Sequence, residues 1–205
     1  YNRIGGNAAP VSNLIQGTWS NSGNVAVTGI QMASVASGTV ADNTIQSFNL
    51  SGTGASSFTG ISISTSQTVN AQSNIIGGPS RAIVLAGTGG LRGIHSTSSN
   101  ASTLIGGNTA PLGNTISNLE ASSGTAQIIG IHTTAGSNTI QNNTIDTLTH
   151  SGANTGTGAS ASVIGILLAN SSGTQNTLNN TIYGLYNSAA GAVNVSGICL
   201  SANAS

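Results

Sequence analysis

The dipeptide Gly-Ile recurs along this chain at a nearly constant spacing. Six copies occur, and the steps between successive isoleucines are 31, 33, 37, 35 and 32 residues. A period of this length is typical of proteins that stack similar supersecondary units, each of which contacts mainly its neighbours. The isoleucines of the repeat are Ile30, Ile61, Ile94, Ile131, Ile166 and Ile198.

A second motif, Asn-Thr-Ile, follows the Gly-Ile motif in most repeats. Its asparagines are Asn43, Asn114, Asn143 and Asn180, and an apolar residue follows each isoleucine three positions later. The intervening runs are short, rich in β-branched residues and bounded by Gly, Ser or Asn, which is typical of strands and turns. No segment keeps a helical apolar period over ten residues. The repeat therefore predicts about three short strands in each unit.

Short strands at this period indicate an all-β fold, a parallel β-helix (β-solenoid) of about six coils with 31–37 residues each. The same strand of successive coils would pair in parallel, about 4.8 Å apart, and the chirality of parallel crossovers favours a right-handed coil. A glycine before each isoleucine fits a bend or a close backbone approach. The six Gly-Ile isoleucines would form one inward ladder, and a second would contain Ile45, Ile116, Ile145 and Ile182.

The repeated asparagines predict a structural ladder of their own. Asparagine tolerates left-handed turn conformations and can bond its own backbone, and stacked asparagines can also bond one another along a fibre axis. We therefore expect Asn43, Asn114, Asn143 and Asn180 to occupy one turn of successive coils.

A longer period is superimposed on the short one. The segment IGGNAAPV at residues 4–11 reappears as IGGNTAPL at 105–112, an offset of 101 residues. Residues 1–205 are thus predicted to form a single solenoid of two three-coil units, about 1–102 and 103–205. Joining the last residue to the first would keep the Gly-Ile step at 37 residues, which lies within the observed range. We expect the chain to be a segment of a longer array, or to stack end to end with copies of itself.

The charge inventory excludes several classes of function. Charged residues make up 3% of the chain and the net charge is zero, whereas about a quarter of an average protein is charged. A nucleic-acid partner is not expected, because no basic stripe is present to neutralise phosphates. Membrane insertion is not expected either, since no apolar run approaches the length that spans a bilayer.

No catalytic constellation is apparent. Asp42, Glu120 and Asp146 fall in different repeat positions, so paired carboxylates are not implied, and no Asp-rich calcium loop occurs. His95 and His132 both follow Gly-Ile directly and should stack on the outer face. A shared metal is a weak hypothesis, because no third ligand is evident. We expect surface decoration there, a packed or half-exposed thiol at Cys199 and no cofactor.

The segment GIHTTAGSNTIQNNTI at residues 130–145 resembles the right-handed parallel β-helix repeat family. Its long Gly/Ser/Thr inserts are similar to those in large secreted bacterial surface proteins. The resemblance covers nearly the whole chain and implies an extracellular, secreted or cell-surface location. It specifies function poorly, because the fold hosts lyases, tailspikes, adhesins and structural fibres alike.

The sequence favours a non-enzymatic structural segment of an extracellular bacterial filament or surface array, with copies of itself or adjacent repeats as partners. The alternative is a carbohydrate-binding or adhesin domain that uses the inserts at residues 53–57 and 151–160 to bind glycans. A polysaccharide lyase or hydrolase is the third hypothesis. A glycan-binding face should gather aromatic side chains, whereas Trp19, Tyr183 and Tyr186 are scattered.

Overall fold

The computed structural model describes residues 2–4, 13–16, 19–21, 23–33, 37–99, 102–170 and 172–201. Strands dominate these residues, and two one-turn 3-10 helices, η1 (Ala110–Leu112) and η2 (Gly158–Ser160), interrupt them. All strand pairs are parallel and join residues of successive coils, as between β4 (Ala26–Ala33) and β8 (Ser57–Ser64). The predicted parallel β-solenoid is confirmed, with about five complete turns.

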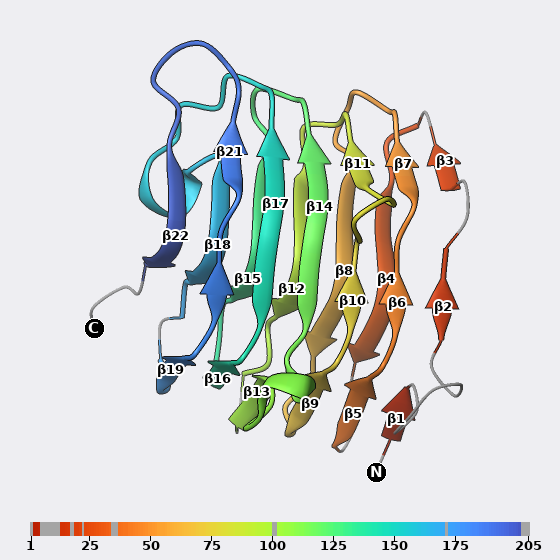
Figure 1. Cartoon of the computed structure of the whole chain (residues 1–205), viewed down its shortest axis with the longest axis vertical. Helices are drawn as coiled ribbons and strands as arrows, with labels where there is room; N and C mark the ends of the chain where they lie inside the picture. Colours follow the sequence, from red (N-terminus) through yellow and green to blue (C-terminus); the bar gives the residue numbers. More distant parts are fainter. Residues whose placement is uncertain are drawn as a thin grey trace.

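Three sheets form the wall of the solenoid (Figure 1). Each sheet holds one strand, or two short strands, from every coil. We call one coil, or the part of it that lies in a given sheet, a rung. Sheet A contains β1 (Asn2–Ile4), β5 (Gly38–Ala41), β9 (Val69–Gln72), β13 (Ser102–Gly106), β16 (Ser137–Gln141) and β19 (Gln175–Leu178). Sheet C contains β4, β8, β12 (Gly90–Ser96), β15 (Gln127–Thr133), β18 (Val163–Leu168) and β22 (Val195–Leu200).

Sheet B faces sheet C across the core, and most of its rungs are split by a corner into two short strands. Its continuous strands are β14 (Thr115–Ala121) and β17 (Thr144–His150). The split rungs are β2 (Leu14–Ile15) with β3 (Trp19–Asn21), β6 (Thr44–Ile45) with β7 (Phe48–Leu50), β10 (Ile75–Ile76) with β11 (Ile83–Leu85), and β20 (Thr181–Ile182) with β21 (Leu185–Asn187).

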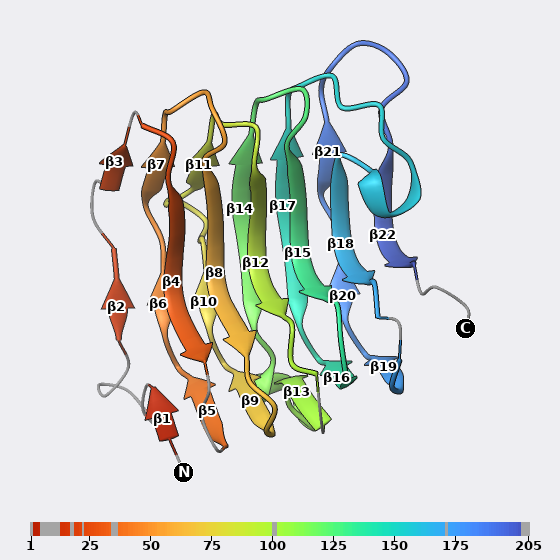
Figure 2. The ribbon, with the colours of Figure 1, turned by 180° about the vertical axis from the view of Figure 1, so that it is seen from behind.

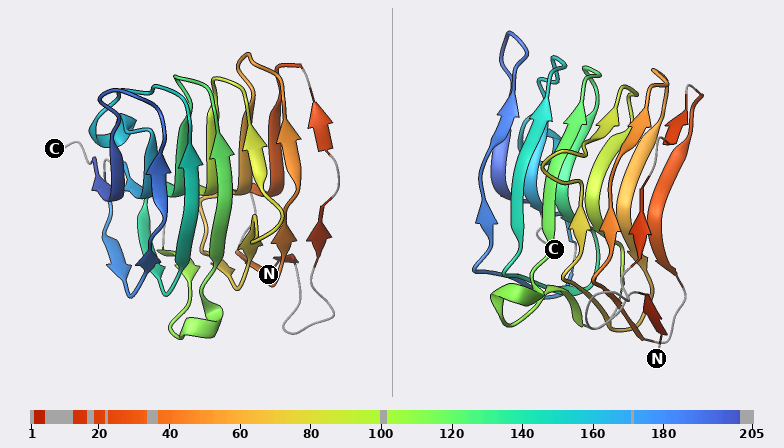
Figure 3. Two further views of the ribbon diagram at one scale, coloured as in Figure 1. Left: turned by 45° about the horizontal axis from the view of Figure 1, so that its top comes forward. Right: turned by 45° about the vertical axis from the view of Figure 1, so that its right-hand side comes forward.

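The coil is right-handed, as predicted. Sheet B rises on the near side in Figure 1 and sheet C descends behind it, while the chain advances from the N-terminal to the C-terminal side. The reverse view shows the same winding (Figure 2). The excursion that carries η1 projects away from the stack at one corner (Figure 3). Longer loops are accommodated at corners, where they leave the backbone ladders intact.

The predicted isoleucine ladders lie in register. Ile30, Ile61, Ile94, Ile131, Ile166 and Ile198 pair strand by strand along sheet C. In sheet B the ladder runs through Ile45, Ile116, Ile145 and Ile182, and it also includes Ile15 and Ile76. Burial departs from expectation in the last rung, where Ile198 is 51% exposed and Ile182 is half-buried. Both occupy inward positions, but no further rung within the described residues covers them.

The glycine of each Gly-Ile pair marks the point where inward–outward alternation fails. In β12 the side chains of Leu91 and Ile94 are both fully buried, although they are three residues apart. A Cβ on Gly93 would lie 2.5 Å from the carbonyl oxygen of Gly130 and 2.7 Å from Cγ2 of Ile116. Only glycine fits between the next rung and the facing ladder, which is the close approach expected from the sequence.

Two corners of the coil use left-handed backbone. The residue before the ladder asparagine has positive φ in four rungs, at Asp42, Ser73, Asn142 and Asn179. A second corner, within sheet B, places Ser47, Gly77, Asn118, Thr147 and Gly184 at positive φ. Gly, Asn and Asp adopt this region at least cost, whereas Thr147 is β-branched and strained there. These corners turn the chain sharply enough to close each rung.

The insert at residues 151–162 folds over the outer face of sheet C. Ala161 packs there with Ile129, Ile164 and Leu167, which form a second apolar cluster outside the solenoid core. The Gln127 side chain holds the insert in place, because its Nε2 donates to the carbonyl oxygens of Ala159 and Ala161 at 2.9 and 3.0 Å. One insert has therefore become part of the packed structure.

Candidate functional site

A ladder of asparagine amides runs along the corner between sheets A and B. It contains Asn13, Asn43, Asn74, Asn114, Asn143 and Asn180, whose Nδ2 groups donate to the Oδ1 of the following asparagine at 2.8 to 2.9 Å. The same Oδ1 accepts the backbone N–H of the preceding asparagine at 3.0 to 3.1 Å. The four asparagines named from the sequence all belong to this ladder.

The amide of an interior rung has all its hydrogen-bonding groups satisfied. The second Nδ2 hydrogen of Asn114 goes to the carbonyl oxygen of Ala71 in the preceding rung at 2.8 Å, so two donors and two acceptor positions are used. Asn13 and Asn74 were not predicted, because Leu14 and Ile75 stand where the motif has threonine. The apolar pairs Leu14-Ile15 and Ile75-Ile76 after an asparagine were the available signal.

The last described rung, made by β19 to β22, is an open end of the solenoid. Its inward side chains Val195, Ile198 and Leu200 are 43%, 51% and 68% exposed, whereas Val163 and Ile166, their partners in β18, are fully buried. A Cβ on Gly197 would have no atom within 4 Å, although the equivalent Cβ on Gly165 would lie 2.5 Å from the Gly197 oxygen. Among the described residues, none covers this core surface.

The hydrogen-bond ladder is also open at this end. Asn180 accepts from Asn143 and donates to the Ile140 carbonyl oxygen at 2.8 Å. Its other Nδ2 hydrogen, which in earlier rungs reaches the next asparagine, has no acceptor in the described part of the chain. At the opposite end, Asn13 donates to Asn43, and no donor among the described residues meets its Oδ1. One end thus offers donors and the other an acceptor.

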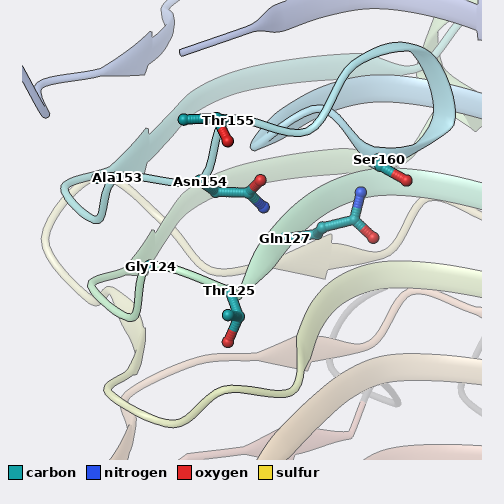
Figure 4. Close-up of a pocket in the computed structure, with 7 residues that line it drawn as sticks. All are labelled: Gly124, Thr125, Gln127, Ala153, Asn154, Thr155 and Ser160. Carbon is teal, nitrogen blue, oxygen red and sulfur yellow. The ribbon is translucent and has the colours of Figure 1, made fainter. Parts of the chain in front are cut away.

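A polar hollow of about 370 Å³ opens between two loops beside sheet C. Figure 4 shows Gln127 and Asn154 on either side of it, with Thr125, Thr155 and Ser160 at its margin. The amides already hold the loops: Asn154 Nδ2 donates to the Ala126 oxygen at 2.7 Å and its Oδ1 accepts from Gly156 N. The lining contains no charged or aromatic side chain, and hydroxyl groups supply much of its free hydrogen-bonding capacity.

His95 and His132 stack on the outer face of sheet C, as the repeat register predicts. Their ring centroids are 4.7 Å apart and their planes differ by 12°. Burial, with the charge of Arg92 adding to it, lowers the pKa of His95 to about 4. Burial also lowers the pKa of His132 to about 3, with His95 and Arg92 contributing less. Both rings are therefore neutral at neutral pH.

The histidine pair is poorly arranged for a shared metal ion. Parallel stacked rings direct their nitrogen lone pairs side by side and not toward a common point, and Nδ1 of His132 already accepts from Arg92 Nε at 3.2 Å. Across the part of the chain that the structure describes, no cluster of three or more His, Cys, Asp or Glu side chains has metal-binding geometry. Arg92 was not predicted, because strand alternation would place a residue two positions before the inward Ile94 on the core side, and the break in alternation at Gly93 turns Arg92 outward.

The third histidine, His150, lies apart from the other two. It is buried at the end of β17, where Gly152 N–H donates to its Nδ1 at 3.0 Å and Nε2 lies 3.1 Å from the Ala126 carbonyl oxygen. Burial lowers its pKa, while the hydrogen bonds with Gly152 and Ala126 oppose the shift. His150 fills a core position that Leu85 and Ala121 occupy in earlier rungs. Its contacts indicate a structural role.

The structure does not bring the carboxylates together. Glu120 is opposite Thr149 and Asp146 is opposite Ser117, so these two lie three positions apart along adjacent strands. Asp42 is at a corner after β5. Cys199 is a free thiol at the margin of the outer apolar cluster. This geometry contains no acid–base pair of the kind that glycoside hydrolysis requires.

Comparison with family models, with curated proteins and with solved structures finds no match to this chain. Among the residues placed by the structure, none forms a helix with the length and apolar character needed to cross a membrane.

Proposed function

We propose that this chain is a non-enzymatic structural segment of an extracellular bacterial filament or surface array, and that it assembles by end-to-end stacking of solenoid rungs. The open last rung is the observation that carries the proposal. The motif at residues 130–145, which resembles repeats of large secreted bacterial surface proteins, supports the extracellular and bacterial setting.

Apolar burial would drive the contact. Val195, Ile198 and Leu200 are already ordered on a strand, so covering them costs little additional conformational entropy. Each fully buried aliphatic side chain contributes roughly 1.5–3 kcal/mol relative to an exposed one. The exposed edges of sheets A, B and C add rows of unpaired backbone groups, which are templates for further parallel strands.

The asparagine ladder would set the direction and register of stacking. Asn180 offers an Nδ2 hydrogen at the last rung, and Asn13 offers Oδ1 at the first, so a head-to-tail contact continues the 2.8–2.9 Å ladder. A head-to-head contact would place the Asn180 Nδ2 donors of two copies opposite each other, without an acceptor between them. Because this interface is heterologous and continues the coil without closing a ring, it produces an open fibre. The low charge of the chain also limits repulsion between copies.

Light scattering coupled to size-exclusion chromatography, followed by electron microscopy, tests the proposal. We expect linear particles whose length grows with protein concentration and whose axial repeat is a multiple of the strand spacing. The double variant Ile198→Lys/Leu200→Lys should remain monomeric, because stacking would bury two unpaired charges. A wild-type chain that stays monomeric at every concentration reached would refute the proposal.

A matched control places the same two charges on the outer surface of the same rung. Asn176 and Tyr186 are exposed and pair with the outward residues Thr139 and Thr149. Asn176→Lys/Tyr186→Lys should therefore assemble as the wild type does. Equal loss of assembly in both double variants would show that charge alone, and not the open core surface, governs association.

The polar hollow between the loops at residues 124–127 and 153–160 supports a second candidate, a carbohydrate-binding adhesin. Its hydroxyl and amide lining could bond sugar hydroxyl groups. A glycan array probed with the monomeric Ile198→Lys/Leu200→Lys variant separates the candidates. Binding that Thr155→Val reduces would favour the adhesin, whereas an array without signal leaves the structural role as the supported one.

A further inference from the structure

Arg92 is a partly buried cation without a counterion in the described structure. It lies on β12 in sheet C, whereas Asp42, Glu120 and Asp146 all belong to rungs or corners of sheets A and B. Its Nε–H donates to Nδ1 of His132 at 3.2 Å, and no other side-chain hydrogen bond of Arg92 is formed within the described residues. A guanidinium has five N–H donors, so both terminal Nη groups remain available.

The position of the guanidinium is fixed by its surroundings. A Cβ on Gly90 would lie 2.7 Å from Nη1 of Arg92, so the side chain lies over the bare backbone of this glycine. The hydrogen bond to His132 holds its other side, and His95 stacks on His132 at 4.7 Å. No Arg92 nitrogen is both buried and unpartnered. The Nη groups make no hydrogen bond within the described residues, so they are not buried. The Nη groups are therefore both oriented and accessible.

The histidines form one side of the site around the guanidinium. Because Nδ1 of His132 accepts from Arg92, the proton of the neutral ring is on Nε2, on the side of the ring away from that hydrogen bond. Nε2 of His95 is buried without any hydrogen-bond partner. A buried polar atom without a partner is costly. Within the described residues, no acceptor meets the Nη groups of Arg92 and no partner meets Nε2 of His95.

We propose that Arg92, His95 and His132 form a binding site for an oxyanion, with the Nη groups of Arg92 as its donors and His132 holding the guanidinium in place. A carboxylate or a sulfate has the geometry that guanidinium groups bind in pairs of hydrogen bonds. No carboxylate side chain faces the site from the strands adjacent to β12, because the neighbouring outward positions are Thr59 and Ser62 on β8 and Ile129 on β15. This site is independent of end-to-end stacking.

Nuclear magnetic resonance titration of the monomeric Ile198→Lys/Leu200→Lys variant tests the proposal. Sulfate, glucuronate and glucose are the probes. We expect sulfate and glucuronate to shift the Arg92 Nε–H and the ring protons of both histidines, and glucose to leave them unchanged. A stronger response to glucuronate assigns a sugar-borne carboxylate as ligand, and a stronger response to sulfate assigns a free oxyanion. No saturable shift with either anion would overturn the site.

Two substitutions separate the guanidinium from general effects. Arg92→Thr introduces the residue that occupies the same position in the preceding rung, Thr59, and should weaken anion binding about tenfold to a hundredfold. Gly90→Ala keeps the charge but displaces Nη1, so binding should weaken while the net charge is unchanged. Arg81→Thr removes an exposed arginine elsewhere and should bind as the parent does. Equal weakening by Arg92→Thr and Arg81→Thr would show nonspecific charge attraction and refute the site.

Discussion

At the scale of single residues, the glycine and the asparagine that recur in every repeat have different structural roles. The glycine of each Gly-Ile pair creates space for the next rung, and the asparagine of each corner satisfies backbone and side-chain groups along the axis. Both roles depend on a following rung, so the same residue type has different importance in the interior and at the open end. This difference provides matched controls within one chain.

The space requirement can be tested at Gly130. Gly130→Ala would place a Cβ 2.6 Å from the Gly165 carbonyl oxygen and 2.8 Å from Cγ2 of Ile145, so we expect it to lower the free energy of unfolding by about 1–3 kcal/mol. A Cβ on Gly197 would have no atom within 4 Å, so Gly197→Ala should leave the free energy of unfolding of the monomer unchanged. Urea denaturation measures both, and a similar loss in the two variants would contradict the steric explanation.

The asparagine ladder can be tested at Asn114. Asn114→Ala removes the acceptor of two Asn74 donors and the donor to Ala71 and Asn143. Each buried group left unpaired costs about 1–3 kcal/mol, so the loss of stability should be about 3 kcal/mol or more. Asn180→Ala, in the half-buried last rung, should cost less. If the two variants lose equal stability under conditions where the chain is monomeric, the ladder is not the source of the effect.

At the scale of elements, the register of β12 against β15 brings together groups that the sequence keeps 37 residues apart. Parallel in-register pairing places identical repeat positions side by side, so the stacking of His95 on His132 follows from the period alone. The fold and both isoleucine ladders were predictable for the same reason. The contact of Arg92 with His132 was not, because it joins different repeat positions and depends on a side-chain conformation.

The histidines on β12 and β15 predict that the free energy of unfolding depends on pH. The folded-state pKa values of His95 and His132, about 4 and about 3, lie below the ordinary value of 6.5, so the unfolded chain binds more protons below pH 6.5. Stability should be complete above that pH and should fall as pH decreases toward 4 and then 3. His150, whose pKa is also lowered, contributes in the same direction.

Urea midpoints measured between pH 7.5 and pH 4 provide the measurement. His132→Leu introduces the residue found at the same position in the next rung, Leu167, and should make the slope shallower. A midpoint that does not change over this range, or one that rises on acidification, would show that the histidines are not desolvated as the structure indicates.

At the scale of the whole molecule, the solenoid is an array whose terminal rung repeats the surface of every interior rung. Stability and assembly are therefore linked, because any copy that covers the open end binds only the folded form. We expect the melting temperature of the wild type to rise with protein concentration. The Ile198→Lys/Leu200→Lys variant should melt at a temperature that does not depend on concentration, and calorimetry at several concentrations checks both. Concentration dependence that persists in this variant would place the contact elsewhere.

The sequence by itself determined the period, and with it the parallel solenoid, the two isoleucine ladders, the position of the asparagines and the need for glycine beside each ladder isoleucine. These features follow because every coil imposes the same neighbours on the same position. Only the tertiary structure decided how the insert at 151–162 folds over sheet C and how Arg92 meets His132. These depend on loops of unequal length and on side-chain contacts between positions that no repeat relates.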